Sequence, residues 1–103
     1  MYSSITTIRM QPDQLDRSAQ VWQELHAAGA APEGLRSARY LVDRATGQVA
    51  IVALWETEQQ ARAFEEGEQV RRVRDALRPF LAPDAGAADR RTYEVAASLE
   101  RGG

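Results

Sequence analysis

His26 is the only side chain of this chain whose ordinary pKa lies near neutral pH. It falls on the apolar stripe of a predicted helix, four residues after Trp22, so we expect it to face the sheet that the helix covers. An imidazole in that place could take a proton from a bound molecule, which makes His26 the best candidate for a general base. The alternative is a histidine at a helix end that interacts with the terminal carbonyl groups.

Trp55 marks a second place where chemistry could occur. It directly follows an apolar run, Val49 to Leu54, that is typical of a buried strand. Thr57 and Gln60 then have the spacing of a capping box at the start of a helix. An indole at the mouth between a sheet and its covering helix can form the floor of a pocket for a flat ligand. The alternative is that Trp55 only closes the core.

The other aromatic residues are candidates for contact with such a ligand. Trp22 from the helix and Trp55 from the sheet could bracket a planar ring, although a shared core is equally consistent with their positions. Tyr40 and Tyr93 lie in predicted strands and could hydrogen-bond a substrate oxygen, or be there for their β-propensity alone. Phe64 lies on the apolar stripe of the second helical region and is a further candidate.

Composition excludes several mechanisms. The 103 residues include no Cys, no Lys and no Asn, so thiolate nucleophiles, disulfides, thiolate metal sites and Schiff bases are ruled out. With a single histidine we expect no metal centre. A net charge of −2 does not favour nucleic acid as a partner. We expect no membrane span and no targeting segment, which makes the cytoplasm the predicted compartment.

The elements that must hold these residues alternate between strands and helices. The predicted order is β-α-β-β-α-β, which indicates an α+β, ferredoxin-like fold with a four-stranded antiparallel sheet and two helices on one face. We expect one domain over residues 1–99 and a disordered tail over 100–103. A glycine, Gly67, should interrupt the second helical region. The predicted elements are strand Tyr2–Met10, helix Pro12–Ala28, strand Leu35–Asp43, strand Val49–Leu54, helices on either side of Gly67, and strand Arg90–Leu99.

The second and third strands are apolar on both sides, so the sheet face without helices should meet a partner. A second copy of the chain is the simplest partner, and we predict a homodimer through this open sheet face. Four arginines near the end of the second helical region are interleaved with acidic residues at helical spacing, which is typical of a solvated surface. These arginines are Arg71, Arg72, Arg74 and Arg78.

The element order, the stretch LWETEQQARAF, the helix ending around RPFL and the last strand with TYEV together resemble the antibiotic biosynthesis monooxygenase family. The resemblance covers nearly the whole chain. It implies a dimeric α+β barrel and, in some members, oxidation of aromatic anthrones to quinones by dioxygen without metal, flavin or haem. Other relatives degrade haem.

The resemblance places Trp55 at the position of the family's tryptophan, before the second helix. The family's asparagine has no counterpart, and the second helix carries Phe64 and Glu65 and no histidine that could ligate haem iron. Haem degradation is therefore disfavoured. We expect a cofactor-independent monooxygenase acting on a small hydroxyaromatic or quinol-type compound with dioxygen, with His26, Trp55 and Tyr93 as catalytic residues. The alternative is a non-catalytic dimer of the same fold that binds a small ligand.

Overall fold

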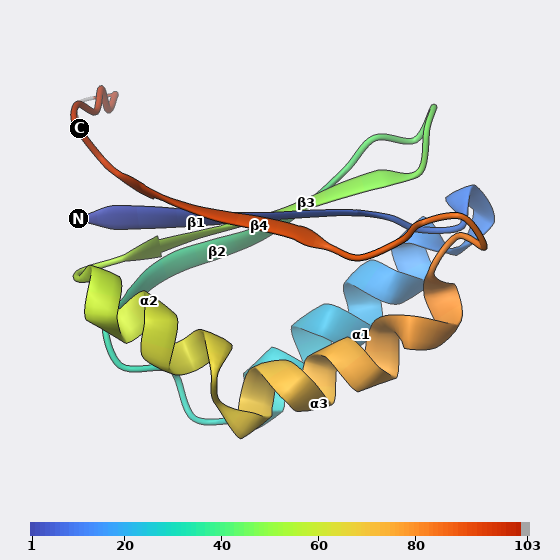
Figure 1. Ribbon diagram of the computed structural model, residues 1–103, viewed down its shortest axis with the longest axis horizontal. Helices are drawn as coiled ribbons and strands as arrows, with labels where there is room; N and C mark the ends of the chain where they lie inside the picture. Colours follow the sequence, from blue (N-terminus) through green and yellow to red (C-terminus); the bar gives the residue numbers. More distant parts are fainter. Residues whose placement is uncertain (102–103) are drawn as a thin grey trace.

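The computed structural model describes residues 1–101 and shows a single four-stranded sheet with every helix on one of its faces (Figure 1). The strands are antiparallel and lie in the order β2-β3-β1-β4. This is the predicted α+β, ferredoxin-like fold, with the second helical region divided in two. The elements are β1 (Tyr2–Arg9), η1 (Pro12–Gln14), α1 (Leu15–Ala28), β2 (Leu35–Val42), β3 (Gln48–Trp55), α2 (Glu58–Glu65), α3 (Glu68–Leu77), η2 (Arg78–Phe80) and β4 (Asp89–Glu94).

The junction after β3 forms one half of the capping box that the sequence predicts, because Oε1 of Gln60 has no hydrogen-bond partner among the described residues. Thr57 is the N-cap of α2, and its hydroxyl accepts a hydrogen bond of 3.1 Å from the backbone N–H of Gln60. The side chain of Gln60 packs against Gly34, whose φ of +82° is a conformation that glycine adopts most readily. Gly67 separates α2 from α3 and is the N-cap residue of α3, as predicted for a break in the helical region.

Two strands differ from their predicted patterns. A β-bulge between Leu35 and Ser37 shifts the alternation of β2, so that Leu35 pairs with Trp55 and shares the helix side of the sheet with Ala38. Regular alternation along β2 would instead place Leu35 on the face of Arg39 and Leu41.

The last strand is also shorter than the predicted Arg90–Leu99. Its pairing with β1 runs from Asp89 opposite Thr7 to Glu94 opposite Tyr2. Because β1 begins at Tyr2, residues beyond Glu94 have no neighbouring strand to extend the ladder. Only one further backbone hydrogen bond follows, from Val95 to Met1.

Two apolar clusters fill the space between sheet and helices, one towards each end of β3. Val49 belongs to the first and Trp55 to the second. The buried members are Met10, Leu15, Val49, Val73 and Leu77 in the first cluster, and Ala53, Trp55 and Ala61 in the second. Within residues 1–101, no helix has the length and apolar character needed to span a membrane.

Candidate functional site

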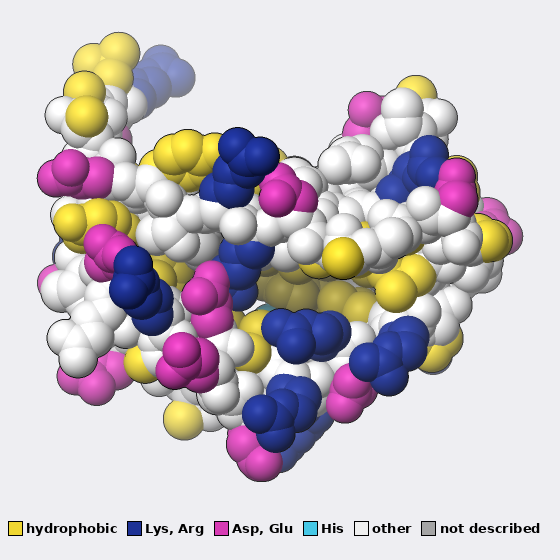
Figure 2. All heavy atoms as spheres, viewed as in Figure 1, with side chains coloured by type: hydrophobic (Ala, Val, Ile, Leu, Met, Phe, Trp, Pro, Cys, Tyr) yellow, Lys and Arg dark blue, Asp and Glu magenta, His cyan; other side chains and the backbone are white. Residues whose placement is uncertain are grey.

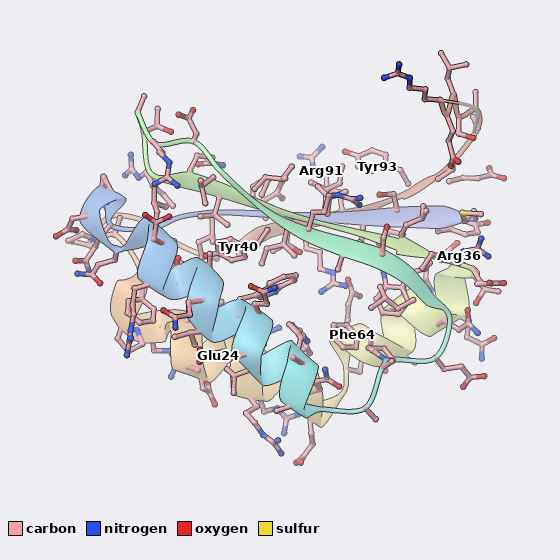
Figure 3. The ribbon with its side chains drawn as sticks, turned by 180° about the vertical axis from the view of Figure 1, so that it is seen from behind. Glu24, Arg36, Tyr40, Phe64, Arg91 and Tyr93 are labelled. Carbon is pink, nitrogen blue, oxygen red and sulfur yellow. The ribbon has the colours of Figure 1, made fainter. Side chains whose placement is uncertain are left out.

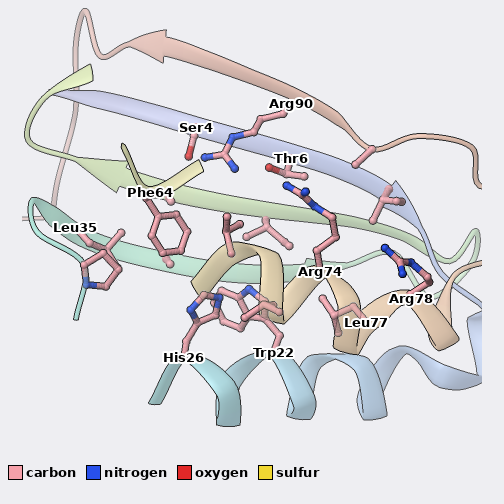
Figure 4. Close-up of a pocket in the computed structure, with 18 of the residues that line it drawn as sticks. Ser4, Thr6, Trp22, His26, Leu35, Phe64, Arg74, Leu77, Arg78 and Arg90 are labelled. Carbon is pink, nitrogen blue, oxygen red and sulfur yellow. The ribbon is translucent and has the colours of Figure 1, made fainter. Parts of the chain in front are cut away.

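A cavity of about 650 Å³ lies between the sheet and its helices (Figure 4). Its size is within the range of about 300–1,000 Å³ that is usual for small-molecule sites. The sheet contributes the helix-side residues of β1 and β3, and α1, α2 and α3 contribute the opposite wall. The loop before β4 closes one side. The aromatic, hydroxyl-bearing and charged side chains that line the cavity are Ser4, Thr6, Trp22, His26, Trp55, Phe64, Arg74, Arg78 and Arg90.

A row of aromatic rings runs along this cavity. The ring centres are 5.0 Å apart between Trp22 and His26, 5.9 Å between His26 and Phe64, and 5.3 Å between Phe64 and Trp55. The tryptophan pair that the sequence predicts to bracket a ligand is therefore joined by two intervening rings. Edge and tilted arrangements at these separations favour a further aromatic ring as a neighbour.

Trp55 is 1% exposed and is both part of the core and part of the cavity wall. Its indole N–H donates a hydrogen bond of 3.1 Å to the hydroxyl of Ser4, which is itself buried. Since this donor already has a partner, Trp55 can offer a ligand the surface of its ring but no hydrogen bond.

His26 lies near the end of α1, half-buried against Trp22 and Phe64. Burial lowers the pKa of His26 from its ordinary value of 6.5, so the ring is neutral at pH 7. Its Nδ1 is 3.0 Å from the side-chain amide of Gln69 on α3. The amide nitrogen of Gln69 faces Nδ1 and donates to it, so the neutral ring carries its hydrogen on Nε2. Turning the amide by 180° would place its oxygen against Nδ1–H and leave Nε2 free to accept a proton.

The two candidate tyrosines do not join this group. Tyr40 packs against Trp22, and its hydroxyl is 2.8 Å from that of Ser18, a residue with no exposed surface. Burial raises the pKa of Tyr40, and the bond to Ser18 acts in the opposite direction. Tyr93 is 49% exposed and lies on the sheet face away from the helices, beside Arg91 (Figure 3). The structure thus brings together His26 and Trp55, but not Tyr93.

The three charged residues of the cavity, Arg74, Arg78 and Arg90, were not among the candidates that the sequence suggested. Arg74 and Arg78 were expected on a solvated surface, but they stand four residues apart on the side of α3 and η2 that borders the cavity. The available signal was the position of Arg74 directly after the buried Val73 and four residues after Val70, next to the apolar stripe. Figure 2 shows basic side chains gathered around a hollow lined with apolar ones.

The fold and this cavity define a small ferredoxin-like protein with a largely apolar internal cavity. The family model described as antibiotic biosynthesis monooxygenase matches residues 1–76, nearly three quarters of the chain. The chain therefore belongs to the antibiotic biosynthesis monooxygenase family. The matched part includes Trp22, His26, Trp55, Phe64 and Arg74, whereas Arg90 lies beyond it.

Solved structures support the same fold. A proposed antibiotic biosynthesis monooxygenase from Deinococcus radiodurans has a TM-score of 0.75 at 16% identity, with 100% of both chains covered. One from Caulobacter crescentus CB15 has a TM-score of 0.73 at 16% identity and covers 96% of this chain and 90% of its own. One from Nitrosomonas europaea has a TM-score of 0.72 at 16% identity, covering 91% and 97%. No curated protein matches the sequence.

Proposed function

We propose that this protein is a cofactor-independent monooxygenase that oxidises a small hydroxyaromatic or quinol-type compound in the cavity between sheet and helices. The observation that carries the proposal is the row of rings from Trp22 to Trp55, with the chain's only histidine inside it. Membership of the antibiotic biosynthesis monooxygenase family supports an oxidation by dioxygen.

In this proposal the substrate supplies the electrons. With the Gln69 amide turned so that its oxygen accepts from Nδ1–H, Nε2 of His26 takes the proton of an enol or phenol, which breaks the O–H bond and leaves an electron-rich anion. The anion passes one electron to dioxygen, the two radicals combine to form a carbon–oxygen bond, and the peroxide takes the proton back from His26. Loss of water from the resulting peroxide leaves a quinone, so an anthrone and dioxygen give an anthraquinone and water. The apolar walls exclude bulk water from these intermediates.

Two features of the site suit this role for His26. Its lowered pKa keeps the ring unprotonated at neutral pH, as a base must be. Its contacts with Trp22, Phe64 and Gln69 hold the ring in place. Trp55, which is 1% exposed, would support the row of rings through its contact with Phe64. Tyr93 would take part only from the interface with a second copy, because it lies on the other face of the sheet.

The test is dioxygen uptake by metal-stripped protein with a panel of anthrones, quinols and reduced hydroxyaromatics, measured against the spontaneous rate. We expect saturable uptake that falls by about tenfold or more in His26→Ala. Glu24→Gln is the matched control, because Glu24 is an exposed residue of the same helix and points away from the sheet (Figure 3). Uptake that survives His26→Ala would refute the assignment of the base.

The runner-up function is ligand binding without turnover. It is favoured by the hydrogen bonds that already engage Trp55 with Ser4 and His26 with Gln69, which suit a fixed binding wall as well as a reactive one. Compounds that quench tryptophan fluorescence saturably, with none of them consumed above the spontaneous rate, would establish this function instead.

We also propose that the protein is a homodimer through the sheet face that carries no helix. Strand alternation places six apolar side chains there among polar and charged ones such as Arg39 and Arg91, with Leu41 46% and Tyr93 49% exposed in the single chain. Sedimentation should give twice the chain mass, and Val52→Glu at the centre of this face should shift it towards the monomer. A monomeric wild type would refute the dimer. The apolar residues of this face are Ile5, Leu41, Ala50, Val52 and Leu54, together with Tyr93.

A further inference from the structure

The rim of the cavity carries basic side chains from three elements. Arg74 and Arg78 come from the end of α3 and from η2, and Arg90 comes from β4 on the other side of the opening. In Figure 4 Arg74 extends from its helix towards Thr6, and Arg90 extends from its strand towards Ser4. Within residues 1–101, no acidic side chain lines the cavity.

The carboxylates around the rim do not neutralise these arginines fully. Glu65 forms an ion pair with Arg90, although Nε of Arg90 lacks a partner with hydrogen-bond geometry. Asp75 pairs with Arg78 at 3.0 Å on the exposed surface. Arg74 makes no ion pair with any described residue. Three positive charges against two negative ones leave one unmatched positive charge at the rim.

The unmatched positive charge at the rim affects Arg90 most. Its side chain is 24% exposed, and burial is the largest influence on its pKa, which is lowered from the ordinary value. Glu65 opposes that change, and the nearby positive charge of Arg74 adds to it. Two like charges therefore face each other across a half-buried opening, an arrangement that a bound anion would relieve.

We propose that the cavity binds an aromatic monoanion, with its ring among Trp22, Phe64 and Trp55 and its carboxylate between Arg74 and Arg90. One carboxylate supplies the single negative charge that the rim lacks, and its two oxygens suit the planar fork of an arginine. The hydroxyl of Thr6, which pairs with Arg90 across β1 and β4, lies on the same side of the cavity as a further hydrogen-bond donor. This inference rests on the proposed function, because it names the substrate class of the same cavity. That class is a hydroxyaromatic compound that carries a carboxylate.

Direct binding tests the inference without turnover. The probes are anthracene-2-carboxylate and its uncharged counterpart, anthracene-2-carboxamide, titrated into the wild-type protein at pH 7.5 by calorimetry. We expect the carboxylate to bind about tenfold more tightly or better, and the preference to weaken as salt is added. Arg74→Gln should abolish the preference. Arg74 is the residue to change because it is exposed and unpaired, so its loss leaves the core and the ion pairs intact.

Arg71→Gln is the matched control, because it removes the same charge from an exposed residue of the same helix that does not line the cavity. It should keep the preference. The inference is overturned if neither probe binds, if carboxylate and amide bind equally, or if Arg71→Gln and Arg74→Gln weaken carboxylate binding to the same degree.

Failure of the anion-site inference can be distinguished from failure of the proposed oxygenase function. Uptake of dioxygen with a neutral anthrone, together with equal binding of the two probes, would remove the anion site and leave the oxygenase. A carboxylate preference that depends on Arg74, with no uptake by any hydroxyaromatic, would remove the oxygenase and leave the anion site.

Discussion

The hydrogen bond between Trp55 and Ser4 allows the structural role of the tryptophan to be separated from its role in the site. Ser4→Ala leaves the indole ring in place but removes the hydroxyl that accepts its hydrogen bond. The indole N–H then has no partner, and Trp55 is only 1% exposed. A buried polar group without a partner costs about 1–3 kcal/mol of unfolding free energy. In a domain of this size each kcal/mol corresponds to roughly 4–8 °C in Tm. We therefore expect Ser4→Ala to lower Tm by at least ~4 °C.

The measurements are thermal unfolding, which gives Tm, and urea unfolding, which gives the unfolding free energy. Both are followed by far-ultraviolet circular dichroism at one fixed protein concentration, since dissociation of a dimer would couple to unfolding. Ser3→Ala is the control, because Ser3 is the next residue of β1, points to the other face and makes no side-chain hydrogen bond with a described residue. It should change the unfolding free energy by less than about 0.5 kcal/mol. Trp55→Phe, alone and combined with Ser4→Ala, completes a double-mutant cycle whose coupling energy should be about 1 kcal/mol.

Ligand binding supplies the second half of the test. Because the N–H of Trp55 is donated to Ser4, Ser4→Ala should leave affinity for an aromatic probe nearly unchanged, whereas Trp55→Phe should weaken it by removing ring surface. Equal stability of Ser4→Ala and wild type would refute the reasoning about the buried donor. A large loss of affinity in Ser4→Ala would show that the hydrogen bond sets the position of the ring in the site.

Two further predictions concern residues beside the aromatic row. Tyr40→Phe should lower the unfolding free energy by about 0.5–1.5 kcal/mol, because it removes the hydrogen bond to Ser18 while Ser18 keeps its bond to the carbonyl of Leu15. It should leave affinity for the aromatic probe unchanged. A loss of affinity without a loss of stability would instead assign the hydroxyl to ligand binding. For His26, the lowered pKa means that the unfolded chain binds its proton at higher pH than the folded one. Stability should therefore fall as pH drops below about 6.5 towards the lower pKa of the folded state, and His26→Gln should flatten the Tm profile over that window; a wild-type profile that stays flat, or that is unchanged in His26→Gln, contradicts this.

The order of the elements could be predicted because each one carries a local signal. The apolar run before Trp55, the cap at Thr57 and the break at Gly67 act over a few residues, and all three are present in the structure. Trp22, His26, Phe64 and Trp55 were candidates for the same reason, since each lies on the side of its helix or strand that faces the interior.

The features that could not be predicted depend on what lies opposite a residue in space. The bulge after Leu35 changes the face of Leu35 relative to the rest of β2, and alternation in the sequence gives no sign of it. The end of β4 is set by the first residue of β1, more than 80 positions away in the chain. Arg74 carries the charge pattern of a surface residue, and only the position of β4 across the opening makes it part of a site.

These two kinds of feature divide the site into a wall and a rim. The wall of rings is fixed by the core, because Trp55 and Phe64 also pack one of the two apolar clusters, so changes to it disturb stability as well as binding. The rim consists of exposed positions on α3 and of β4, and the loop before β4 also borders the cavity. Substitutions at exposed positions disturb a fold least. The rim is therefore the part of the cavity at which the choice of ligand can change while the fold is kept, and the charge of Arg74 is the first determinant of that choice to examine.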